Sequence, residues 1–187
     1  MKKKLNWKLL RSQKGDSLRI AKVRFDWWKS PRNGMELKAT VLETPDWVNI
    51  VAITPIGKIL VVKQFRFGAQ AVTTETPAGV MEADEGPQDA AIRELVEETG
   101  YTTANWTYLG WVEPNPAFQD NRCYQFLAKD VRKTHETAQD EGEDILFSEM
   151  TIEEVKNEIK EERMRNSLSL LTLSRVFDIW NIKTTKL

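Results

Sequence analysis

The sequence is poor in the residue types that carry several common chemistries. Among 187 residues it has one cysteine, Cys123, and one histidine, His135. A single cysteine cannot form an intrachain disulfide, which indicates a reducing compartment, and we expect Cys123 to be packed as a small apolar side chain. A single histidine offers no basis for a histidine metal cluster or a nucleophile triad. Because His135 lies in a polar stretch, we expect it to be exposed.

Neither charge nor hydrophobicity is concentrated in one part of the chain. The 27 basic residues nearly balance the 28 acidic ones, for a net charge of −1, so no basic field predicts nucleic acid binding. No apolar run approaches the ~20 residues that span a bilayer, and the basic start at Met1–Lys4 lacks the apolar core of a secretory signal. We predict a soluble cytoplasmic protein of one domain, or one domain with a small appendage, with no membrane or nucleic acid partner.

Two residues mark the ends of a helix in the middle of the chain. Pro87 suits the first helical position, where its missing N–H would be unpaired, and Gly100 suits the left-handed residue after a helix end. They predict a helix over residues 87–99. At 100° per residue, one broad side of this helix is apolar and is expected to face a core. Its residues are Ala91, Ile92, Leu95 and Val96.

Glu94, Glu97 and Glu98 share another face of this helix, at spacings of i, i+3 and i+4. Like charges at these spacings repel by roughly 0.2–0.5 kcal/mol per pair, and the helix dipole disfavours anions in the last turns by roughly 0.3–1 kcal/mol each. A hard divalent cation would reverse both penalties, because Mg²⁺ and Mn²⁺ prefer carboxylate oxygens. The alternative is a solvated charge run on an amphipathic helix.

The spacing around these glutamates favours the metal site. Seven fixed residues at roughly 0.06 usage each give a chance match on the order of 10⁻⁹ per start position. They are Gly79, Glu85, Arg93, Glu94, Glu97, Glu98 and Gly100. Together they resemble the signature of the Nudix hydrolase family, with Tyr101 as the one soft departure, since that position is usually aliphatic.

The resemblance implies an α/β/α sandwich that hydrolyses a nucleoside diphosphate linked to another group. It implies that Glu94, Glu97 and Glu98 hold Mg²⁺ or Mn²⁺ on the diphosphate, with two or more ions when substrate is bound. It also implies catalytic roles for Glu97 and for Arg93, which would brace the acidic loop through Glu85.

An N-terminal extension precedes the expected Nudix domain at 46–187. Residues 18–28 and 35–41 alternate in polarity around Asn33-Gly34, which predicts a β-hairpin, and residues 1–17 are an arm or a short first strand. Extensions of this kind, here residues 1–45, form dimerising antiparallel sheets in ADP-ribose-type Nudix hydrolases, so we expect a homodimer. The alternative places these strands in the main sheet. Either Trp27 or Trp28 could stack on a nucleobase, or both could serve packing, and neighbours on a strand point to opposite faces.

The rest of the chain alternates between short strands and polar turns. Residues 130–143 form a polar, acidic loop. Thr151–Glu154 is a capping box that opens a helix to about residue 163, and Asn166 or Ser167 caps a last helix that includes Leu168, Leu171, Val176 and Ile179. Strands are predicted at 47–53, 58–65, 106–112, 122–128 and 145–150, and residues 72–76 lead into the signature.

Three features outside the signature resemble ADP-ribose pyrophosphatases and related nucleotide-sugar hydrolases. Pro116 lies sixteen residues after Gly100, where those enzymes also have a proline. Arg66 in Gln-Phe-Arg matches an arginine that contacts phosphate in them. The segment from Glu75 to Gly79 matches one in which the carbonyl at Ala78 ligates a metal. The resemblance therefore implies substrate-binding roles for Glu75, Arg66 and Pro116. The alternatives are that Pro116 is a turn residue and Arg66 a surface charge.

The acidic segment 140–145 resembles the mobile loop that supplies the catalytic glutamate in ADP-ribose pyrophosphatases. The resemblance implies that Glu141 is this catalytic glutamate, with Glu143 as the alternate. Gly142 would let the loop close over the substrate. The alternative is a solvated acidic loop.

We therefore expect Mg²⁺-dependent hydrolysis of nucleoside diphosphate sugars, with ADP-ribose as the first candidate substrate. Alternatives are a GDP-mannose or broad sugar-nucleotide hydrolase, an NADH or other dinucleotide hydrolase, and a non-catalytic Nudix-fold binding module. A structural Ca²⁺ helix is disfavoured, because looped oxygen ligands are missing.

Overall fold

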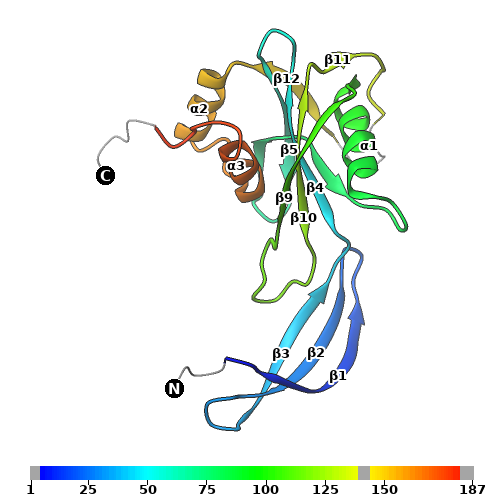
Figure 1. Cartoon of the computed structure of the whole chain (residues 1–187), viewed down its shortest axis with the longest axis vertical. Helices are drawn as coiled ribbons and strands as arrows, with labels where there is room; N and C mark the ends of the chain where they lie inside the picture. Colours follow the sequence, from blue (N-terminus) through cyan, green and yellow to red (C-terminus); the bar gives the residue numbers. More distant parts are fainter. Residues whose placement is uncertain (1–4, 139–143, 182–187) are drawn as a thin grey trace. The chain divides into compact units, whose positions relative to one another are not determined.

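The computed structural model describes residues 5–138 and 144–181, which form two compact units (Figure 1). One unit comprises Met1–Asp46 with Glu113–Arg122, and the other comprises Trp47–Val112 with Cys123–Leu187. No helix in the described part of the chain is long and apolar enough to cross a membrane.

The first unit is an antiparallel sheet of three strands in the order β1 (Lys8–Ser17), β2 (Lys22–Lys29) and β3 (Glu36–Glu43). Gly34 has a φ of 72° in the β2–β3 turn, which agrees with the hairpin predicted at Asn33-Gly34. Residues 1–17 were predicted to be an arm or a short first strand, and within them β1 is a strand of 10 residues whose side chains are all exposed.

The segment 113–122 joins this unit through long-range hydrogen bonds. The Leu42 N–H donates to the Phe118 carbonyl at 2.7 Å. Arg24 on β2 donates to Asp120 at 3.2 Å and also pairs with Asp26, which is buried, and Glu43. These contacts explain why a segment far along the chain belongs to the N-terminal unit.

The second unit is built around a seven-stranded mixed sheet in the order β12-β5-β4-β10-β9, with β6 paired to β5 and β7 to β4. The β4 and β10 strands are parallel, and the other pairs are antiparallel. Its strands are β4 (Trp47–Ile53), β5 (Ile59–Arg66), β6 (Ala71–Glu75), β7 (Ala78–Val80), β9 (Asn105–Val112), β10 (Cys123–Lys129) and β12 (Leu146–Met150). A small ladder pairs β8 (Tyr101–Thr102) with β11 (Arg132–Lys133).

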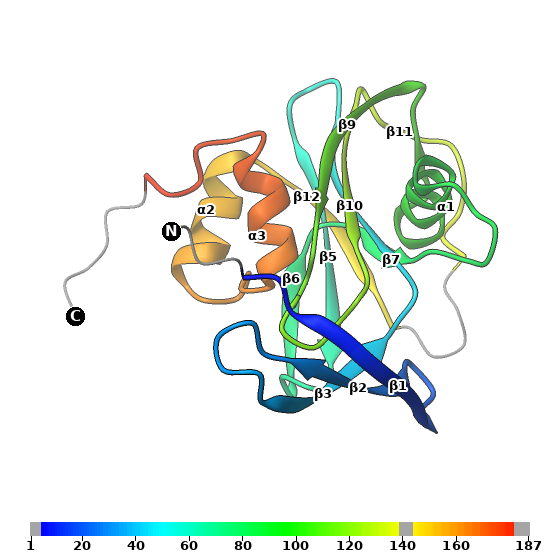
Figure 2. The same cartoon turned by 60° about the horizontal axis from the view of Figure 1, so that its bottom comes forward.

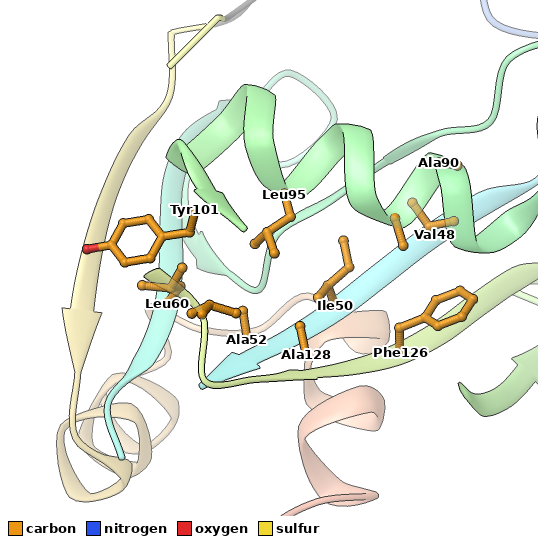
Figure 3. Close-up of a cluster of buried hydrophobic side chains, with 11 residues drawn as sticks. Val48, Ile50, Ala52, Leu60, Ala90, Leu95, Tyr101, Phe126 and Ala128 are labelled. Atoms are coloured by element: carbon orange, nitrogen blue, oxygen red, sulfur yellow. The ribbon is translucent and has the colours of Figure 1, made fainter. Parts of the chain in front are cut away.

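Helices cover both faces of this sheet, so the unit has three layers (Figure 2). On one face lies α1 (Pro87–Thr99), and on the other lie α2 (Ile152–Lys160) and α3 (Ser167–Ser174). Alternate residues of β4 serve the two cores: Ile50 packs toward α1, and Val51 packs toward α2 and α3. Figure 3 shows the first core, with Leu95 pointing from α1 onto the strands.

The predicted helix over residues 87–99 has the bounds of α1. Pro87 opens it, and Gly100 ends it with a φ of 75° while its N–H donates to the Val96 carbonyl. Ile92 was expected on the core side but is 37% exposed, because the helix turns Ala90, Ala91 and Leu95 to the core.

Three further expectations need correction. The loop at 130–143 contains the short strand β11. The α2 helix ends at Lys160 instead of about 163, because Glu162 takes a left-handed φ of 57°. The α3 helix ends at Ser174, so Val176 and Ile179 lie beyond it, and both still pack into the second core. The Thr151–Glu154 capping box and the buried Cys123 are as predicted.

Tyr101, the soft departure from the signature, links the end of α1 to β12. Its ring lies in the first core beside Phe147, and its hydroxyl donates to Glu149 Oε1 at 2.6 Å. An aliphatic residue could fill the same space but could not make this bond.

Replacing Tyr101 with Phe should therefore lower the free energy of unfolding by about 1.5–3 kcal/mol, the range for a hydrogen bond to a charged group. Urea unfolding measures the change. Tyr108→Phe is the control, since Tyr108 is 52% exposed, and it should shift stability by less than about 0.5 kcal/mol. Equal stability of Tyr101→Phe and the wild type would contradict the structure.

The same bond predicts a pH dependence. Burial, together with the Glu149 carboxylate, raises the pKa of Tyr101 from 10.0 to about 12. The folded state then holds the phenol proton more tightly than the unfolded state. The stability that this group contributes is present below the unfolded pKa of 10.0 and is lost as the pH rises through about 12. The wild type should lose stability more steeply than Tyr101→Phe over that window.

Candidate active site

The acidic face of α1 lies against the loop that precedes the helix. Glu98 is 2% exposed and Glu94 is 9% exposed, whereas Glu97 is more accessible. Buried carboxylates are rare unless they are paired or ligate a cation. The burial of two of them argues against a solvated charge run.

Arg93 is the centre of this cluster. Its Nε and Nη2 donate to the two oxygens of Glu85, both at 2.9 Å, which is the predicted brace. Nη2 also donates to the Val80 carbonyl, and Nη1 donates to Glu94 at 2.8 Å and to Glu97 at 2.9 Å. The bond to Glu85 raises the pKa of Arg93, and the same bond lowers the pKa of Glu85. One guanidinium thus binds the loop before α1 to two glutamates on the helix.

Two backbone positions on β7 lie against the Glu98 and Glu94 carboxyl groups. The Ala78 N–H donates to Glu98 Oε2 at 3.1 Å. The Glu94 carboxyl lies so close to Gly79 that a Cβ there would stand 2.0 Å from Glu94 Cδ. The signature glycine is therefore needed for space, because any side chain would displace Glu94.

The donor set fits a hard divalent cation. Glutamate oxygens from one helix face lie beside the backbone of Ala78, and such oxygens are what Mg²⁺ and Mn²⁺ prefer. Within residues 5–138 and 144–181, no group of three or more His, Cys, Asp or Glu side chains is arranged to hold a metal ion. Glu94 Oε1 and Glu97 Oε2 each accept a hydrogen bond from Arg93 Nη1, so one guanidinium nitrogen holds both carboxylates.

Arg66 and Glu75, two predicted substrate residues, are bound to each other. Two hydrogen bonds of 2.8 Å join the guanidinium and the carboxylate. Thr73 and Asn166 also donate to Glu75. Asn166 was predicted only as a helix cap, and its contact with a residue 91 positions earlier has no signal in the sequence.

The other predicted site residues belong to the first unit or fall outside the described residues. Trp27, Trp28 and Pro116 belong to the first unit, where Pro116 is exposed in a turn. The Arg11 guanidinium lies 3.6 Å from the centre of the Trp27 ring, so a cation covers one face of that ring. Glu141 and Glu143 lie outside the described residues. His135 is exposed, as expected.

The fold is shared with another protein of known structure. A solved structure of an ADP compounds hydrolase superposes with a TM-score of 0.79 over 91% of each chain, at 18% sequence identity. The NUDIX domain model matches residues 44–171. The chain belongs to the NUDIX domain family and is a Nudix hydrolase, which confirms the predicted α/β sandwich with an N-terminal antiparallel sheet.

Two of the similar relatives carry different names. A methanol dehydrogenase activator from Bacillus methanolicus is 32% identical over 167 residues, which are 89% of this chain and 90% of the relative. An ADP-ribose pyrophosphatase from Bacillus subtilis is 37% identical over 123 residues, which are 65% of this chain and 66% of the relative.

Gly79→Ala should weaken metal binding without unfolding the protein. The new methyl group would push the Glu94 carboxyl away from β7, and the far end of a glutamate can move without disturbing the core. We expect at least about a tenfold weaker Mg²⁺ affinity in a calorimetric titration, the scale on which disturbed ligands act. Gly68→Ala is the matched control, because nothing lies within 4 Å of its Cβ position. Equal affinities in the two variants would show that Glu94 is not a ligand.

Proposed function

We propose that this enzyme hydrolyses the diphosphate of nucleoside diphosphate sugars with Mg²⁺, and that ADP-ribose is the first candidate substrate. The observation that carries the proposal is the acidic face of α1, where Glu94 and Glu98 are buried against Ala78 and Gly79 beside Glu97. The choice of substrate is supported by the relatives named ADP-ribose pyrophosphatase, from Bacillus subtilis and Mycobacterium tuberculosis.

Each signature residue then has a role. Glu94, Glu97, Glu98 and the Ala78 carbonyl would hold Mg²⁺, or Mn²⁺, as two or more ions with substrate bound. When bound, the metal would neutralise the diphosphate and lower the pKa of water. Arg93 keeps Glu94 and Glu97 on one side of the helix.

The reaction needs a base that faces the diphosphate. Glu141 is our candidate and Glu143 is the alternate, both outside the described residues. The carboxylate takes a proton from water while the water oxygen bonds to one phosphorus. The bond from that phosphorus to the bridging oxygen breaks, which yields AMP and ribose 5-phosphate from ADP-ribose. The variants Glu141→Gln and Glu143→Gln, made separately, identify the base. Only the variant that lacks the base should show a kcat lowered by about 10²–10⁴ while KM is retained.

Residues outside the signature would bind the rest of the substrate. Arg66 would contact a phosphate, and Pro116 would shape the loop after β9. Either Trp27 or Trp28 would stack on the base. The Arg11 guanidinium and Lys38 Nζ already lie 3.6 and 5.1 Å from the centre of the Trp27 ring, so stacking on Trp27 would require one of these cations to move.

We also propose that residues 1–45 form a homodimer contact. Every side chain of β1 is exposed, and apolar side chains such as Leu9, Leu10 and Leu37 are 45%, 43% and 54% exposed. Exposed apolar residues of this number suggest a partner surface. Light scattering of the purified protein would show a mass twice that of the chain, and a monomer at micromolar concentration would contradict the proposal. We also propose a cytoplasmic location, which the single cysteine supports.

A second candidate comes from the relative named methanol dehydrogenase activator, which matches along nearly the whole chain. In this second candidate function, the protein would raise the activity of a dehydrogenase. Adding the purified chain to a methanol dehydrogenase and following alcohol oxidation tests this candidate, and an unchanged rate would remove it.

A substrate screen tests the main proposal. The purified enzyme at millimolar Mg²⁺ receives ADP-ribose, GDP-mannose, UDP-glucose, NADH and diadenosine polyphosphates, and a phosphatase reports monophosphate products. We expect fast turnover of ADP-ribose that disappears with EDTA. Preferred turnover of GDP-mannose or NADH would select those alternatives, and no turnover of any compound would contradict the proposal.

Glu98→Gln tests whether Glu98 is a metal ligand. Its amide oxygen can still accept the Ala78 N–H, so the fold should persist. The missing charge should lower turnover by at least about 10² if Glu98 ligates metal. Unchanged turnover would exclude Glu98 as a ligand.

A further inference from the structure

Glu75 is buried at the end of β6, and its carboxylate is fully occupied. Arg66 Nε and Thr73 Oγ1 donate to Oε1 at 2.8 and 2.6 Å. Arg66 Nη2 and Asn166 Nδ2 donate to Oε2 at 2.8 and 2.9 Å. A carboxylate offers about four acceptor positions, and these four donors fill them. Glu75 therefore has no acceptor position left for a substrate hydroxyl.

The pairing fixes the plane of the Arg66 guanidinium. Two parallel N–H···O bonds form a fork, which restrains orientation as well as position. The Glu75 side chain is 1% exposed, whereas that of Arg66 is 42% exposed. A buried carboxylate thus anchors a guanidinium whose side chain is partly exposed.

Asn166 connects this pair to the start of α3. Its Oδ1 caps the helix by accepting the N–H groups of Leu168 at 2.9 Å and Ser169 at 3.2 Å, while its Nδ2 donates to Glu75. A second hydrogen bond joins the first turn of α3 to the end of β6, because Ser169 Oγ accepts the Thr76 N–H at 3.1 Å. The first turn of α3 is therefore held against the end of β6.

We propose that Asn166 is a positioning residue for diphosphate hydrolysis, acting through Glu75 to hold Arg66 toward the phosphates. The inference rests on the proposed function, in which Arg66 contacts phosphate. Glu75 then acts through Arg66 and not on the substrate itself. Among the common cap residues, an asparagine amide can accept helix N–H groups through its oxygen while its nitrogen donates to a carboxylate.

Asn166→Ser separates the two roles of Asn166. Serine is an equally good helix cap, so the midpoint of urea unfolding should change little. It has no amide donor for Glu75, so Arg66 should lose part of its restraint. We expect the KM for ADP-ribose to rise about tenfold, with kcat within about twofold of the wild type. An unchanged KM would overturn the proposal.

Thr151→Ala is the matched control for the loss of a cap. Thr151 caps α2 by accepting the Glu154 N–H, and it lies outside the cluster around Glu75. This variant should lower the unfolding midpoint and leave KM unchanged. An equal rise in KM for Thr151→Ala would mean that any weakened cap disturbs the site, which would also overturn the proposal.

A double-mutant cycle tests whether Asn166 acts through Glu75. In the Glu75→Gln background, Asn166→Ser should change KM by less than about twofold, because Glu75→Gln already weakens the connection from Asn166 to Arg66. A full tenfold rise in that background would show that Asn166 acts by another route.

A binding measurement keeps this inference separate from the proposed substrate. If the wild type cleaves none of the screened compounds, the proposed function fails, and calorimetry with inorganic pyrophosphate and Mg²⁺ tests the positioning role. Asn166→Ser should then bind pyrophosphate about tenfold more weakly than the wild type. Equal dissociation constants would overturn the inference.

Discussion

Arg93 holds together carboxylates that would repel one another on a bare helix. Three glutamates at the end of α1 oppose both each other and the helix dipole. The guanidinium offsets this by reaching Glu94 and Glu97 on the helix and Glu85 in the loop before it. The path of that loop follows from these bonds, since Arg93 also binds the Val80 carbonyl. The site is thus assembled from one helix and the segment that leads into it.

Local features of the sequence predicted this part of the molecule well. Pro87 and Gly100 gave the bounds of α1 because each acts through its own backbone, at the first helical position and in the left-handed region. The capping box at Thr151 and the turn at Gly34 were equally local. Ile92 was misplaced because periodicity gives relative directions around a helix, and the packing of Ala90 on the sheet then decides which side is buried.

Features that depend on distant residues could not be predicted in this way. The segment 113–122 joins the N-terminal unit through Arg24 and Asp120, which are 96 positions apart. Glu75 was expected to contact the substrate, but its four donors come from β5, β6 and the start of α3. No spacing rule relates Asn166 to Glu75. Only the fold shows that the carboxylate is saturated.

Manganese binding tests whether the acidic face of α1 holds the metal, because Mn²⁺ can replace Mg²⁺ and the concentration of free Mn²⁺ is measured by electron paramagnetic resonance. We expect saturable binding to the wild type without any substrate, and at least about tenfold weaker binding for Glu98→Gln. Glu153→Gln is the control, since this α2 side chain is 77% exposed and should leave binding unchanged. If Glu98→Gln binds Mn²⁺ as tightly as the wild type, the acidic face of α1 does not hold the metal.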